Sequence, residues 1–170
     1  MKVLVATASR HGATKGIGDE IASRLSSHAM IADSLPVEEV ADLSGYDAIV
    51  LGSAVYAGSW LEHARHFIDL HAAEIATRPT WIFSSGPLGR PAVPDEANAV
   101  HAEPILERTG AREHRVFTGK LDMHELGFGE RAVSRVVRAK EGDFRDWTAI
   151  HEWADSIATA LEASVQGDVR

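Results

Sequence analysis

The chain has 170 residues, of which 45% are apolar and 25% charged, and its formal net charge is −8. This length and composition predict a single globular domain over residues 1–170, with a core large enough to fold without a disulfide or a metal. Cysteine is absent, which excludes disulfides, thiolate metal sites and cysteine nucleophiles, so redox chemistry would require a bound cofactor. The negative charge disfavours nonspecific nucleic-acid binding, which depends on Lys and Arg.

The sequence shows no export signal and no membrane span. The first apolar run is too short for the core of a signal peptide, and no run reaches the roughly 18 residues that cross a bilayer. We therefore expect a cytoplasmic protein with at most peripheral membrane contact. Its acidic surface either suits basic protein partners or serves only solubility.

Apolar strands and amphipathic helices alternate along the chain. Continuous apolar runs predict buried strands at 3–6, 47–53 and 80–85, and shorter runs predict strands at 30–32 and 115–118. Apolar spacing predicts helices over 14–27, 61–75, 95–108 and around 150–161, with turn-rich sequence at 35–46 and a loop at 54–60. This alternation predicts an α/β fold with a five-stranded parallel sheet and helices on both faces.

Three loops follow the carboxyl ends of the predicted strands, at 9–14, 54–60 and 86–91. In open parallel sheets, ligands bind beyond the carboxyl ends of the strands, where the strand order reverses. We therefore expect these loops to converge on one site.

The first loop contains residue types that hold a phosphate. Ser9 and Thr14 offer hydroxyls, His11 offers a further donor, and Gly12 allows the backbone to bend around an anion at the start of a helix. The same residues also suit an ordinary turn and helix cap, and the loop by itself leaves both interpretations open.

A dinucleotide-binding dehydrogenase is the main competing interpretation. Residues 13–18 (ATKGIG) superficially resemble the glycine turn of short-chain dehydrogenases, and Asp33 could imitate a ribose-binding acid. However, neither Tyr46 nor Tyr56 is followed by a lysine four residues later, and the chain is short for that family. We therefore interpret Asp33 as an ordinary aspartate at a strand end.

The loop pattern Ser-x-x-Gly-x-Thr, the strand at 46–53 and the segment 54–58 (AVYAG) together resemble the flavodoxin superfamily. Residues 142–147 (GDFRDW), ahead of the last helix, resemble the branch of menaquinone-dependent protoporphyrinogen dehydrogenases. The resemblance covers nearly the whole chain. It implies a flavodoxin-like, doubly wound sheet of strand order 2-1-3-4-5 that binds FMN.

The resemblance also implies which residues bind the cofactor. The first loop would hold the phosphate, while the second and third would flank the isoalloxazine ring, with Gly58 free to reorient its peptide. Tyr56 and Trp60 either contact the ring or pack against the second helix. The predicted cofactor-binding residues are Ser9, Arg10, His11, Gly12, Ala13, Thr14, Ser53, Ala54, Val55, Tyr56, Ala57, Gly58, Ser85, Gly86, Pro87, Leu88 and Gly89.

The third loop lacks the aromatic and acidic residues that often cover the flavin in electron-transfer flavodoxins. This difference predicts a more open ring, which suits either a substrate or quinone at the flavin or a redox partner protein.

An insertion at about 119–143 is longer than usual for a connection in an α/β domain. Valines and arginines segregate to different faces of a short helical pattern within it, which makes it basic and amphipathic. This segment could bind the propionates of a porphyrinogen, an anionic membrane or an acidic partner, or be only a solvated helix face. The residues are Arg131, Val133, Arg135, Val136, Val137 and Arg138.

No metal site and no catalytic group is predicted. His63 and His66 are three residues apart on a predicted helix, but no third ligand completes a set. The sequence shows no paired carboxylates and no nucleophile beside a base.

The sequence thus predicts an FMN-dependent redox protein. One version is an oxidoreductase similar to protoporphyrinogen dehydrogenase, which passes electrons from a substrate to a quinone. Another is a flavodoxin that carries electrons between protein partners. A third is a non-redox or deazaflavin-binding module on the same fold.

Overall fold

The computed structural model describes residues 1–56, 58–86, 102–121 and 142–167. The main sheet contains β1 (Lys2–Ala8), β2 (Ile31–Pro36), β3 (Ala48–Tyr56), β4 (Ser59–Trp60), β5 (Thr80–Ser85) and β6 (His114–Phe117). The helices are α1 (Ala13–Ser27), α2 (Glu62–Ile75), α3 (Glu103–Thr109) and α5 (Trp147–Gly167), with a 3-10 turn η1 (Val37–Glu39) after β2. A second sheet pairs β7 (Lys120–Leu121) with β8 (Gly142–Asp143).

The main sheet has the order β2-β1-β3-β5-β6, and every pairing along this path is parallel. The predicted α/β class is therefore confirmed. The five parallel strands follow the order 2-1-3-4-5 when the two-residue β4, which pairs antiparallel with β3, is left out of the numbering. The strand order reverses between β1 and β3, so their carboxyl ends are where a ligand site is expected.

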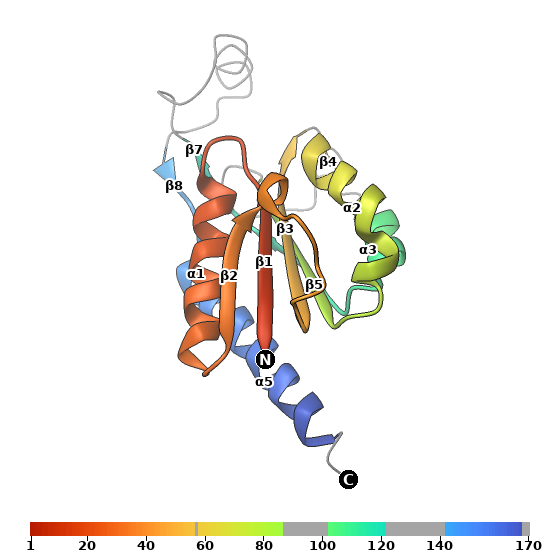
Figure 1. Cartoon of the computed structure of the whole chain (residues 1–170). Helices are drawn as coiled ribbons and strands as arrows, with labels where there is room; N and C mark the ends of the chain where they lie inside the picture. Colours follow the sequence, from red (N-terminus) through yellow and green to blue (C-terminus); the bar gives the residue numbers. More distant parts are fainter. Residues whose placement is uncertain (57, 87–101, 122–141, 168–170) are drawn as a thin grey trace.

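Side chains of the strands alternate between two cores, one on each face of the sheet. Val5 and Phe83 belong to the core covered by α1 and α5, whereas Leu4, Leu51 and Ile82 belong to the core covered by α2, and all five are fully buried. Figure 1 shows α1 and α5 on one side of the sheet and α2 and α3 on the other. The prediction of helices on both faces is therefore confirmed.

Two predicted segments differ from the structure. The second strand extends over Ile31–Pro36 instead of 30–32, because parallel pairing with β1 continues from Lys2↔Ile31 to Thr7↔Pro36 through sequence that reads as a turn. The predicted loop at 54–60 is wrong as well, since β3 continues to Tyr56 and turns back into β4. In both places tertiary pairing overrides weak local strand preference.

The ends of the predicted insertion lie together. β7 and β8 pair antiparallel, with Lys120 opposite Asp143, while residues 122–141, including the whole basic segment, lie outside the described residues. The predicted helix at 95–108 is described only from residue 102, and α3 begins at Glu103 and ends at Thr109. Among the helices of the described residues, none is both long and apolar enough to cross a membrane.

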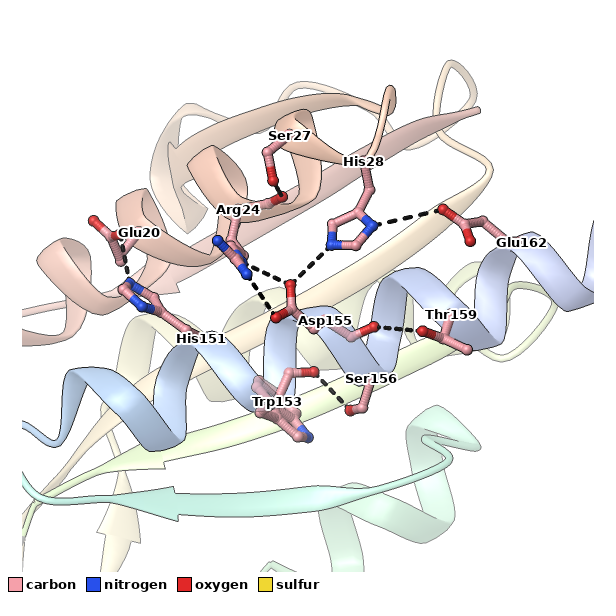
Figure 2. Close-up of polar contacts among 10 residues, drawn as sticks. All are labelled: Glu20, Arg24, Ser27, His28, His151, Trp153, Asp155, Ser156, Thr159 and Glu162. Carbon is pink, nitrogen blue, oxygen red and sulfur yellow. Dashed lines mark hydrogen bonds and ion pairs between the residues drawn. The ribbon is translucent and has the colours of Figure 1, made fainter.

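A polar seam joins α1 to α5. Figure 2 shows Asp155 accepting from Nε and Nη2 of Arg24, at 2.7 and 2.9 Å, while Nε2 of His28 lies 2.8 Å from Asp155 Oδ1. Hydrogen bonds from Arg24 first, and then from His28, hold the pKa of Asp155 well below its ordinary value. His151 and Glu20 form a further contact of 2.7 Å along the same seam. These contacts position α1, whose first turn borders the candidate site.

Candidate functional site

The three predicted loops emerge at the same edge of the sheet. Ala8 pairs with Ser53 at the end of β1 and β3, and Ala54 pairs with Ser85 at the end of β3 and β5. The described parts of the loops therefore lie side by side beyond these strands, at the end where α1 begins (Figure 1). The structure brings together the loop starts that the sequence places more than 70 residues apart.

The first loop presents backbone N–H groups to this edge. Gly12 is the N-cap of α1 and has a φ of 75°, a left-handed conformation that glycine adopts without strain. No side chain of the described residues caps the helix, and its first turn contains no acidic residue, although acids are favoured there. The first turn therefore leaves backbone donors and the positive end of the helix dipole for an anion.

Two buried hydroxyls, one at the end of β1 and one in the first loop, have no partner in the part of the chain that the structure describes. Ser9 Oγ and Thr7 Oγ1 are buried, and neither has a hydrogen-bond partner among the described residues. Buried polar groups are usually paired, so an orphaned hydroxyl at the start of a helix fits a ligand with acceptor oxygens. Thr14, only 1% exposed, lies in the first turn of α1. These residues fit a phosphate group.

The second loop is a tight β-hairpin. Val55 pairs with Trp60 and Tyr56 pairs with Ser59, which leaves two residues at the turn. Gly58 has a φ of 74°, the left-handed conformation that such turns require. This turn is the physical reason why the segment folds back as a strand instead of forming an open loop. Ala57 lies outside the described residues.

Hydrogen bonds to the hydroxyls of two buried serines anchor the hairpin to the sheet. Ser53 Oγ accepts from the backbone N–H of Leu61 at 3.1 Å and donates to the carbonyl of Ala54 at 2.8 Å. Ser84 Oγ accepts from Nε1 of Trp60 at 2.8 Å, and the Trp60 side chain is 3% exposed. Trp60 therefore packs in the core, which agrees with the interpretation that it packs against the second helix. The hydroxyl of Ser53 is already hydrogen-bonded within the protein.

His114 extends this network, and sequence reasoning missed it. Its Nε2 lies 2.8 Å from Ser84 Oγ, and burial lowers the pKa of the imidazole. Because Ser84 already accepts from Trp60, its own proton is available to the neutral imidazole. No local signal marks His114, because the contact depends on the pairing of β5 with β6.

Tyr56 and Arg10 connect the first loop to the second. Tyr56 is 40% exposed, and the Arg10 guanidinium lies 5.5 Å from the centroid of its ring. Such cation–π contacts contribute about 0.5–1 kcal/mol at exposed sites. An accessible aromatic ring therefore stands at the edge of the site, whereas Trp60 is buried.

The third loop is described only at its start. Ser85 is buried, and Gly86 has a φ of 105° and donates its N–H to the carbonyl of Phe117 at 3.0 Å. The predicted residues Pro87, Leu88 and Gly89 lie outside the described residues, so their predicted role stays a prediction.

The alternative sites are not supported by the described residues. Asp33 accepts a hydrogen bond from the Tyr46 hydroxyl at 2.9 Å and lies 2.9 Å from Nζ of Lys2. Its carboxylate is therefore already paired within the protein, at the edge of the sheet. The Lys2 hydrogen bond, followed by that of Tyr46, lowers the pKa of Asp33. His63 pairs with Glu38, and within the described ranges no group of three or more ligand side chains could hold a metal.

A model of the flavodoxin domain family matches residues 4–148 of the chain. Among curated proteins, protoporphyrinogen IX dehydrogenase [quinone] of Escherichia coli K12 is 23% identical over 172 residues, covering 93% of this chain and 95% of the relative.

Two solved structures of similar fold are flavodoxins. An archaeal flavodoxin superposes with a TM-score of 0.66 at 16% identity, covering 95% of this chain and 99% of that chain. Flavodoxin 1 from Bacillus cereus superposes with a TM-score of 0.63 at 16% identity, covering 94% and 98%.

Proposed function

Because the chain belongs to the flavodoxin domain family, an FMN-binding redox family, we propose that it is an FMN-dependent oxidoreductase that passes electrons from a porphyrinogen-like substrate to a quinone. The observation that carries the proposal is the near full-length similarity to the E. coli protein, whose name states both that substrate and that acceptor. In the proposed reaction, hydrogen leaves the substrate, which is oxidised, and reduces the quinone to a quinol.

The chain's own residues would bind and orient the cofactor. Ser9, Gly12 and Thr14, with the N–H groups of the first turn of α1, would hold the phosphate. Tyr56 and the backbone of Gly58 and of the loop from Ser85 would flank the ring. FMN, when bound, supplies the hydride and electron transfer.

The exposed Tyr56 ring supports direct access to the site. A side chain of this size that stays 40% exposed leaves apolar surface for a flat substrate or quinone. The Arg10 guanidinium beside it offers a cation that would suit the carboxylates of a porphyrinogen. The basic segment containing Arg135 and Arg138 would add further positive charge.

A flavodoxin that carries electrons between proteins is the second candidate. Two solved structures of similar fold support it, since each is a flavodoxin whose whole length this chain nearly matches. The net charge of −8 would suit basic protein partners.

Cofactor binding is tested first. Purified protein titrated with FMN should show a perturbed visible spectrum and saturable heat by calorimetry. Thr14→Ala should weaken the affinity, because it removes a hydroxyl from the first turn of α1. Absence of FMN binding by the wild-type protein would refute the proposal.

Anaerobic turnover then separates the two candidates. The FMN-loaded protein is mixed with protoporphyrinogen IX and a menaquinone analogue, and both porphyrin formation and quinol formation are measured. An enzyme forms both products in proportion, whereas a protein carrier forms neither above the rate with free FMN. Arg135→Gln with Arg138→Gln should slow turnover if the basic segment binds the substrate.

A further inference from the structure

Arg145 places a largely buried cation against the first turns of α1. Its side chain is only 14% exposed. A Cβ built on Gly16 would lie 2.6 Å from Nη1 of Arg145, so the guanidinium occupies the space that any side chain at Gly16 would need. The backbone N–H of Gly16 donates to the carbonyl of Gly12 at 2.9 Å, which makes Gly16 part of the turn that begins at the candidate phosphate loop.

Three contacts fix the guanidinium in this position. Asp143 accepts from Nε at 2.8 Å and from Nη2 at 2.5 Å, and the Trp147 ring lies 4.4 Å from the guanidinium carbon. Phe144, which lies between Asp143 and Arg145 in the sequence, donates its N–H to the carbonyl of Gly119 at 3.1 Å. Bidentate pairing and ring stacking are geometries that lysine cannot reproduce.

The two charges of the pair are in different surroundings. Asp143 is 40% exposed, so water screens its carboxylate, whereas the guanidinium is largely covered by α1 and Trp147. Nη1 has no hydrogen-bond acceptor among the described residues. The pair therefore presents its positive end to α1, about 6 Å along the helix axis from Gly12 at 1.5 Å per residue.

We propose that Arg145 is a positioning residue that gives this site its preference for a phosphorylated flavin over riboflavin. The guanidinium supports the turn that carries the phosphate-binding N–H groups and adds positive charge behind it. The proposal rests on the proposed binding of FMN. It assigns a role to the segment 142–147, none of whose residues is among the predicted cofactor-binding residues.

The test compares FMN with riboflavin, which has the same ring but no phosphate. Dissociation constants for both are measured by flavin fluorescence with wild type, Arg145→Gln, Arg145→Lys and Gly16→Ala, together with thermal unfolding of each ligand-free protein. Arg145→Gln should weaken FMN binding about tenfold and riboflavin binding less than twofold. Gly16→Ala should have a similar selective effect, because its methyl group displaces the guanidinium. Arg145→Lys should recover part of the loss, since it keeps the charge.

Each outcome decides the proposal. If Arg145 has a purely structural role, Arg145→Gln will have a lower melting temperature and will bind FMN and riboflavin more weakly by the same factor. That result would overturn the proposal, and so would an unchanged affinity of Arg145→Gln for FMN. Wild-type protein that binds FMN in these experiments leaves the proposed function standing in either case. Wild-type protein that binds neither flavin would refute the proposed function and this proposal with it.

Discussion

Replacement of Ser9 with alanine should change the stability of the ligand-free protein and its affinity for FMN in opposite directions. Ser9 Oγ is buried and has no hydrogen-bond partner among the described residues. A buried hydroxyl without a partner costs free energy, so its removal should not destabilise the ligand-free fold. If the hydroxyl binds the phosphate of FMN, the same change removes a hydrogen bond to a charged group.

The magnitudes make the two effects separable. Removal of the orphaned hydroxyl should raise the free energy of unfolding by up to about 1 kcal/mol, or about 2–4 °C in melting temperature for a chain of this length. Loss of a bond to a phosphate costs about 1.5–3 kcal/mol, which weakens FMN binding about 10- to 150-fold. At an FMN concentration 100 times the wild-type Kd, ligand stabilises wild type by about 2.7 kcal/mol. With a 30-fold weaker Kd, the variant gains about 0.9 kcal/mol. The order of stability should therefore reverse when FMN is added.

Thermal and urea unfolding with and without FMN, combined with calorimetric titration, measure both quantities. Ser53→Ala is the control, because the Ser53 hydroxyl has partners at Leu61 and Ala54. That variant should lose about 1 kcal/mol in the ligand-free state, in contrast to Ser9→Ala. The reasoning is refuted if Ser9→Ala destabilises the ligand-free protein or keeps an FMN Kd within twofold of wild type.

Three further predictions test the fold around the site. Gly52→Ala should cost about 2–3 kcal/mol in urea unfolding, because its Cβ would lie 2.1, 2.2 and 2.7 Å from three Phe83 ring atoms. Phe83→Leu deletes those atoms and should recover part of the loss in the double variant, whereas additive losses would contradict the contact. Asp155→Asn should lower the melting temperature at pH 7, because a carboxylate with a lowered pKa stabilises the fold above its unfolded pKa of about 3.9. That difference should shrink as the pH falls below about 4, and a constant difference down to pH 2 would contradict it. Burial lowers the pKa of His114, so wild type should lose stability as the pH falls below about 6.5, the unfolded value. His114→Gln should show a weaker pH dependence in denaturant titrations at pH 5 and 8, and an equal dependence would exclude this origin.

The central strands and the helix after the first loop could be predicted because their signals are local. The apolar runs at 3–6 and 80–85 lie within β1 and β5, the run at 47–53 begins one residue before β3, and the predicted helix at 14–27 matches α1 to within a residue. A strand buried on both faces needs an unbroken apolar run, and a helix with one buried face needs apolar residues at spacings of three and four. Such patterns are visible without knowledge of the partners.

The second strand and the hairpin could not be predicted in the same way. Residues 33–36 have no apolar run and form a strand only because β1 lies beside them. The hairpin of β3 and β4 depends on the turn at Gly58 and on two serine hydroxyls from different strands. Pairing and side-chain hydrogen bonds between distant residues decide these elements.

By itself, the sequence determined the class of fold, the positions of its central strands along the chain and the loop whose serine, glycine and threonine suit a phosphate. Only the tertiary structure decided that Ser9 Oγ is buried without a partner, that Trp60 is in the core while Tyr56 is exposed, and that Arg145 covers Gly16. The physical reason is that periodicity and turn chemistry act between neighbours along the chain. Burial and charge at the site depend instead on segments more than 100 residues apart, such as Gly16 and Arg145, which meet only when the sheet and its helices have assembled.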